Sequence, residues 1–137
     1  MRLEEIEVGR WAETRRTVTE TDVVLFAAVT GDHNPVHMDE VAARASRFGG
    51  RIAHGMLTAG LVSAVLGTKL PGPGSIYVGQ TLRFTRPVRI GDTVTARVEV
   101  VEVLVEKRRV RLSTVCRNQD GERVLEGEAT VLVPEDA

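Results

Sequence analysis

The chain has 137 residues, 42% of them hydrophobic, which is enough for one core and too little for two ordinary domains. Eighteen basic and nineteen acidic residues leave a net charge of −1, which argues against nucleic acid or a membrane surface as a partner. The single cysteine, Cys116, rules out a disulfide framework. The acidic N-terminus lacks the apolar run of a signal peptide. These features predict one cytoplasmic domain covering residues 1–137.

The first elements are expected to be a short strand and a helix. Residues 9–18 have the composition of a strand. Thr19 is placed to cap the helix that follows, with Asp22 at the third helical position near the positive end of the helix dipole. That helix should end at Gly31, because glycine readily adopts the left-handed conformation that closes many helices.

The densest group of polar side chains in the chain comes next, in residues 31–37. Pro35 keeps Asn34 extended and prevents a continuous helix, and Asn34 can close a turn on its own backbone. Such a stiff loop would hold Asp32 and His37 in a fixed relation. A carboxylate beside an imidazole is what acid–base chemistry on water needs. A purely structural turn, in which both side chains cap helices, explains the same residues equally well.

Other chemistries have weaker support. Asp32, His33, His37 and His54 could ligate a metal ion, but their spacing matches no standard zinc pattern and no thiolate is nearby. We therefore expect no metal. The sequence has no Gly-x-Ser-x-Gly nucleophile elbow, no Walker loop and no dinucleotide fingerprint, so it predicts neither a serine hydrolase nor a nucleotide-binding protein.

The uncharged stretch 52–68 is predicted to be the central helix. Small and bulky apolar residues both recur in it at helical spacing, and a helix that is apolar on every side is buried. A membrane span is the alternative, but seventeen residues that include a histidine make a poor one. At the start of this helix, free N–H groups and the missing side chain of Gly55 would suit an oxyanion. Close packing is the other explanation for Gly55.

The rest of the chain predicts strands joined by short turns. Residues 76–88, 94–100, 110–116 and 125–133 carry apolar side chains in alternation, and 118–121 is typical of a hairpin. Sequential strands with short connections imply an antiparallel sheet. One face of the sheet would be apolar and cover the helix. The expected fold class is therefore α+β, with a long central helix wrapped by an antiparallel β-sheet.

Taken together, these motifs resemble the R-specific enoyl-CoA hydratases of the MaoC-like dehydratase family. The resemblance rests on Gly-Asp-x-Asn-Pro-x-His-x-Asp at 31–39, His-Gly-Met at 54–56 and Gly-Ser-Ile-Tyr at 74–77. It extends over nearly the whole chain and implies the hot-dog fold. One departure is His33, which stands where the family position is variable and often aromatic.

The resemblance also implies roles for individual residues. Asp32 and His37 would be the catalytic pair, and Asn34 would support their loop. Gly55 would donate its N–H to the thioester carbonyl. Three further residues would line an acyl tunnel, namely Ser63, Leu66 and Val131. Because two of these are branched, the tunnel should be short and favour acyl chains of about four to six carbons.

The implied reaction is the reversible addition of water to trans-2-enoyl-CoA, giving (R)-3-hydroxyacyl-CoA. The coenzyme A thioester is the substrate and no cofactor is needed. Family members pair two copies edge to edge, which implies a homodimer. Two alternatives stay open: a hot-dog acyl-CoA thioesterase and a non-catalytic module that binds acyl thioesters. The intact pair of Asp32 and His37 argues against both.

Overall fold

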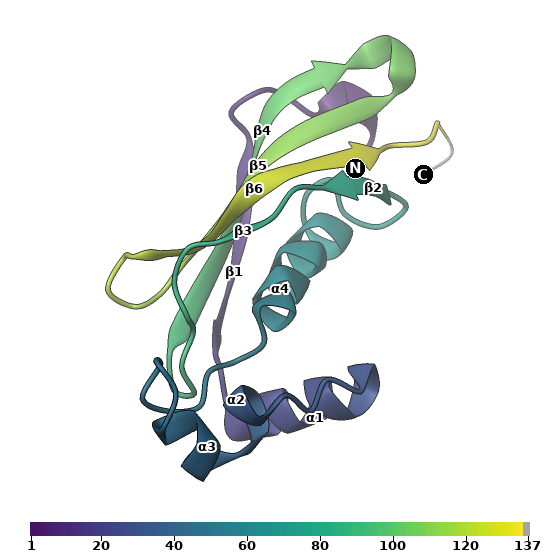
Figure 1. Ribbon diagram of the computed structural model, residues 1–137. Helices are drawn as coiled ribbons and strands as arrows, with labels where there is room; N and C mark the ends of the chain where they lie inside the picture. The colour runs from purple at the N-terminus through teal and green to yellow at the C-terminus, as the bar shows by residue number, and fades with distance from the viewer. Residues whose placement is uncertain (136–137) are drawn as a thin grey trace.

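The computed structural model describes residues 1–135 and places an antiparallel six-stranded sheet around one long helix (Figure 1). The strands follow the order β1-β4-β5-β6-β2, and β3 also pairs with β6. Their bounds are β1 Trp11–Thr17, β2 Ile76–Gln80, β3 Arg83–Phe84, β4 Thr93–Leu104, β5 Arg109–Arg117 and β6 Arg123–Leu132.

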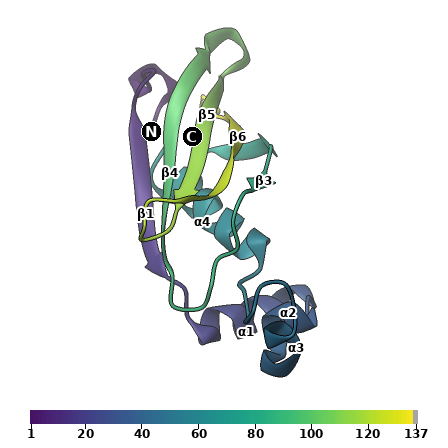
Figure 2. The ribbon, with the colours of Figure 1, turned by 60° about the vertical axis from the view of Figure 1, so that its left-hand side comes forward.

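The long helix, α4 (Gly55–Thr68), lies on the inner face of the curved sheet. Three shorter helices gather beyond its N-terminal end, away from the sheet (Figures 1 and 2). They are α1 Glu20–Thr30, α2 Pro35–Met38 and α3 Glu40–Arg44. We call these three helices the helical cluster. Two 3₁₀ turns complete the described elements, at Leu3–Glu5 and Val105–Lys107.

The core lies between the sheet and one side of α4. The alternation expected in residues 94–100 of β4 and 110–116 of β5 is confirmed, because every second side chain there is buried while the intervening ones are at least partly exposed. From α4, the buried side chains are those of Thr58, Ala59, Val62, Val65 and Leu66. The predicted α+β hot-dog architecture, a long helix wrapped by an antiparallel sheet, is confirmed.

The capping and turn predictions are also confirmed. The Thr19 side chain accepts a hydrogen bond from the backbone N–H of Asp22, and the Asp22 carboxylate accepts one from the N–H of Thr19. Gly31 ends α1 in the left-handed conformation, with φ of 81°. Asn118 closes the β5–β6 hairpin by accepting from the N–H groups of Asp120 and Glu122.

The predicted start of the central helix was wrong. The helix begins at Gly55 rather than at residue 52, because the preceding residues are extended. The Ala53 N–H donates to the carbonyl of Val88 at 2.7 Å, and Ile52 forms an isolated bridge with Arg89. These long-range contacts hold the backbone out of the helix.

Burial on every side of α4 was also a wrong prediction. The sheet covers one side, and the small residues Gly60, Ser63, Ala64 and Gly67 are exposed in the single chain. No helix within residues 1–135 is long and apolar enough to cross a membrane.

The single strand predicted for residues 76–88 is in fact two short ones, β2 and β3. Between them, the chain crosses close to β6, where a Cβ on Gly127 would lie 1.9 Å from the carbonyl oxygen of Thr81. The apolar side chains of Ile76, Val78 and Phe84, expected on the core face, are exposed. This edge of the sheet therefore presents apolar surface.

Candidate active site

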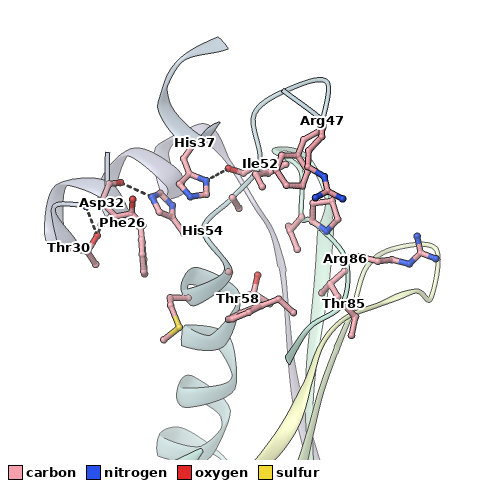
Figure 3. A pocket seen from close by; sticks show the side chains of 18 residues that line it. Phe26, Thr30, Asp32, His37, Arg47, Ile52, His54, Thr58, Thr85 and Arg86 are labelled. Carbon is pink, nitrogen blue, oxygen red and sulfur yellow. Dashed lines mark hydrogen bonds between the residues drawn. The ribbon is translucent and has the colours of Figure 1, made fainter. Parts of the chain in front are cut away.

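A cavity of about 770 Å³ opens where the helical cluster meets the N-terminal end of α4 (Figure 3). That volume lies in the range typical of small-molecule sites. Its polar side chains include Asp32, His37 and His54, and apolar side chains such as Phe26 and Phe84 form much of the remaining wall. Segments far apart in the sequence therefore meet around one cavity.

The loop before α2 is held by its own side chains. The Asn34 N–H donates to Asp32 Oδ1, and the Val36 N–H donates to Asn34 Oδ1, both at 3.2 Å. The Thr30 hydroxyl accepts from the Asp32 N–H, also at 3.2 Å. The turn expected at Asn34 is thus present. One oxygen of the Asp32 carboxylate is engaged in the loop, and the other is left for a ligand.

His37 projects from α2 into the cavity and is only 8% exposed. Its Nδ1 lies 2.7 Å from the carbonyl oxygen of Ile52. A carbonyl can only accept a hydrogen bond, so Nδ1 carries the proton and Nε2 has the free lone pair. Arg51 ties this region together, donating to the carbonyl of His37 at 2.7 Å and to the carboxylate of Glu20 at 2.6 Å.

The two predicted catalytic side chains lie close together in space. A carboxylate oxygen of Asp32 and one ring nitrogen each of His37 and His54 all lie within 4.8 Å of one another. One water molecule can hydrogen-bond to two acceptors at that separation. The same three side chains are of types that can bind a divalent metal ion. The expectation that the site holds no metal therefore stays a prediction.

Gly55 is the first residue of α4 and lines the same cavity. The first N–H groups of a helix have no partner within it and lie at the positive end of the helix dipole. A Cβ on Gly55 would lie 2.7 and 2.8 Å from two ring carbons of Phe84. Gly55 therefore packs closely against the Phe84 ring, and a side chain here would have to displace that ring.

The three predicted tunnel residues lie elsewhere. Ser63 is exposed on α4, while Leu66 and Val131 are buried in the core, and none of them lines the cavity of the single chain. Their role stays a prediction. Sequence reasoning assigned no catalytic role to His54 and did not place Phe84 in the site. For His54, the available signal was its position immediately before Gly55.

The fold and the cavity define the class: a hot-dog protein whose cavity brings Asp32 and His37 beside the N-terminus of its long helix. The family model described as the MaoC like domain matches residues 4–124. The chain belongs to the MaoC-like dehydratase family.

Individual relatives are similar over nearly the whole of this chain. A 3-hydroxybutyryl-CoA dehydratase of Methylorubrum extorquens is 54% identical over 96% of this chain and 83% of the relative. An (R)-specific enoyl-CoA hydratase of Aeromonas caviae is 42% identical, covering 98% and 100% of the two chains. The unliganded R-hydratase structure from Pseudomonas aeruginosa superposes with a TM-score of 0.93 at 52% identity, covering 98% and 86%.

Proposed function

We propose that this protein is an R-specific enoyl-CoA hydratase, a hydro-lyase that reversibly adds water to trans-2-enoyl-CoA and yields (R)-3-hydroxyacyl-CoA. The observation that carries the proposal is the meeting of Asp32, His37 and Gly55 around one cavity. The names of the Methylorubrum and Aeromonas relatives support the same reaction in its two directions.

In this proposal the thioester carbonyl binds at the N–H of Gly55. Negative charge builds on the carbonyl oxygen as the enolate forms, and the positive end of α4 stabilises it. Removing one such donor from an enzyme typically costs about 2.7–4 kcal/mol in the transition state. Gly55 is exposed, so a substrate oxygen can reach this end of the helix.

One water molecule would be held between His37 Nε2 and the free carboxylate oxygen of Asp32. Its oxygen forms a bond to C3 of the substrate while one member of the pair takes its proton. The electrons of the double bond move toward the thioester, and C2 then receives a proton from the pair. The proton taken and the proton returned balance, so the reaction draws on no cofactor.

The decisive experiment is incubation with crotonyl-CoA, following the loss of enoyl absorbance alongside the release of free thiol. We expect absorbance to fall without thiol release, and (R)-3-hydroxybutyryl-CoA to form. Asp32→Asn and His37→Ala should each lower turnover at least about 10²-fold while the protein stays folded. His33→Ala, in the same loop but exposed, is the matched control. Thiol release would instead indicate a thioesterase, and binding without turnover a non-catalytic module.

We also propose a homodimer that pairs through β2. This strand lies at one edge of the sheet and exposes Ile76, Tyr77 and Val78, and an apolar open edge invites a second strand. The opposite edge, β1, exposes charged side chains such as Glu13, with Trp11 as its one large exposed apolar residue. In sedimentation experiments, Ile76→Lys should dissociate the dimer and Glu13→Lys should not. A wild-type protein that is monomeric and active at micromolar concentration would refute the pairing.

A preference for short acyl chains belongs to the same proposal. Leu66 and Val131 are branched and almost fully buried, so they are suited to closing the far end of an acyl channel. A blocked channel gives up about 0.8 kcal/mol for every CH₂ group that it cannot cover. The cytoplasmic location stays a prediction from the sequence.

A further inference from the structure

The structure sets His54 at the centre of the site, although the proposed reaction gives it no role so far. Its side chain is only 2% exposed. The ring packs at a tilt against two others, with its centroid 3.9 Å from that of His37 and 4.7 Å from that of Phe26. Its Nε2 lies 2.9 Å from the main-chain carbonyl oxygen of Asp32 (Figure 3).

The tautomer of His54 follows from these contacts. The Asp32 carbonyl can only accept, so Nε2 must carry the hydrogen that it shares. Nδ1 of His54 is buried without a hydrogen-bond partner in the described part of the chain, so a proton there would be an unpaired buried donor. His37 has the opposite arrangement, with its proton on Nδ1. The two neighbouring rings thus each bind a backbone carbonyl through a different nitrogen.

The hydrogen bond from His54 crosses between two parts of the molecule. Asp32 belongs to the loop of the helical cluster, whereas His54 is the residue that caps α4 and directly precedes Gly55. Because the Asp32 side chain is itself fixed to its loop through Asn34, holding the Asp32 carbonyl also sets the position of the carboxylate. The bond therefore fixes the acid–base pair relative to the Gly55 N–H.

We infer that His54 is a positioning residue, which aligns the Asp32 carboxylate with His37 and Gly55 through the Asp32 main chain. The inference rests on the proposed function. Packing against Phe26 and His37 holds the His54 ring in the orientation that this hydrogen bond needs. His54 transfers no proton in the reaction.

The test compares two substitutions at His54 in the crotonyl-CoA assay. His54→Phe keeps an aromatic ring and loses the donor, so kcat should fall about 10–100-fold with KM nearly unchanged, the scale of a small misplacement of catalytic groups. His54→Gln keeps an N–H donor and should retain clearly more activity. The matched control is His33→Phe, which changes an exposed histidine in the same loop and should leave kcat unchanged. Melting curves establish that each variant is folded.

A double-mutant cycle separates positioning from a general structural effect. If His54 acts through the Asp32 carboxylate, His54→Phe should cause little further loss in an Asp32→Asn background. An equal fold loss in both backgrounds would overturn the inference. If the wild-type enzyme hydrates crotonyl-CoA and both His54 variants have the same kcat as the wild type, the inference is also overturned.

A second measurement does not depend on turnover, so it tests the inference even if the wild-type protein is inactive toward crotonyl-CoA. Nitrogen-15 NMR of the histidine rings should show His54 with its proton on Nε2 and His37 with its proton on Nδ1. A proton on Nδ1 of neutral His54 would leave Nε2 unable to donate to Asp32, and would overturn the inference whatever the activity. Should His54→Phe fail to fold, His54→Gln and the NMR measurement still decide.

Discussion

Gly55→Ala should abolish most activity while leaving the fold intact. The new methyl group would lie 2.7, 2.8 and 3.2 Å from three ring carbons of Phe84. Comfortable carbon–carbon contact begins near 3.5 Å, so the ring must retreat by roughly 0.8 Å. The Phe84 side chain is 52% exposed and can move outward, so this shift costs little stability. Alanine also improves helix propensity by up to about 1 kcal/mol, which offsets the strain.

The catalytic cost is much larger than the structural one. The methyl group stands beside the N–H that would receive the thioester carbonyl, so the oxygen can no longer approach it. Loss of one oxyanion donor costs about 2.7–4 kcal/mol, which corresponds to about 10²–10³-fold in kcat. Steady-state hydration of crotonyl-CoA measures this loss, and a thermal melt measures stability.

Gly67→Ala is the control, because it makes the same change in the same helix and its Cβ would meet no atom within 4 Å. That variant should be at least as stable as the wild type and fully active. A Gly55→Ala enzyme with wild-type kcat would show that the carbonyl does not bind at this N–H. Equal losses at both glycines would attribute the effect to the helix rather than to the donor.

Three further substitutions test other parts of the structure. Leu66→Ala should raise kcat/KM for twelve-carbon enoyl-CoA relative to four-carbon enoyl-CoA, measured over a series of chain lengths. A variant with lower stability and an unchanged chain-length preference would show that Leu66 is only a core residue. Arg16 holds the pKa of the Asp22 carboxyl below its usual value. This interaction therefore stabilises the fold at pH values above the usual pKa, and the stabilisation is lost as the pH falls through the lowered pKa. Asp22→Asn should therefore lower the melting temperature at neutral pH and leave it nearly unchanged in strong acid; an equal drop at both would contradict the linkage. Gly127→Ala should destabilise by at least about 1–3 kcal/mol in denaturant titrations, because its Cβ would overlap the Thr81 carbonyl; wild-type stability would mean that the chain moves aside at little cost.

The features that sequence predicted well depend on neighbouring residues. The Thr19 and Asp22 cap, the Gly31 stop and the turn at Asn34 each close within a few positions, so the pattern specifies the contact. The alternation in β4 shows the same thing over a longer span, since side-chain period alone assigns its two faces.

The features that sequence missed depend on segments distant in the chain. Helix propensity favours a start at residue 52, but hydrogen bonding of Ala53 to Val88 overrides it. No local pattern marks His54, because its contacts with Asp32 and His37 form only in the folded chain. The same holds for Phe84, whose contact with Gly55 joins residues that no local pattern relates. Grouping Asp32, His37 and Gly55 required a family resemblance, because spacing alone left a structural turn equally good.

The division between the helical cluster and the sheet predicts where the protein opens locally. Hydrogen bonds that join the two parts run from His54 to Asp32, from His37 to Ile52 and from Ile52 to Val36, so the seam between them passes through the cavity. Local opening along this seam would expose the amides of α1 to α3 to solvent exchange while the sheet stays closed. A ligand that contacts both sides adds its binding free energy to the closed state alone. In hydrogen–deuterium exchange, acyl-CoA should therefore slow exchange in the helical cluster and leave β4 to β6 unchanged.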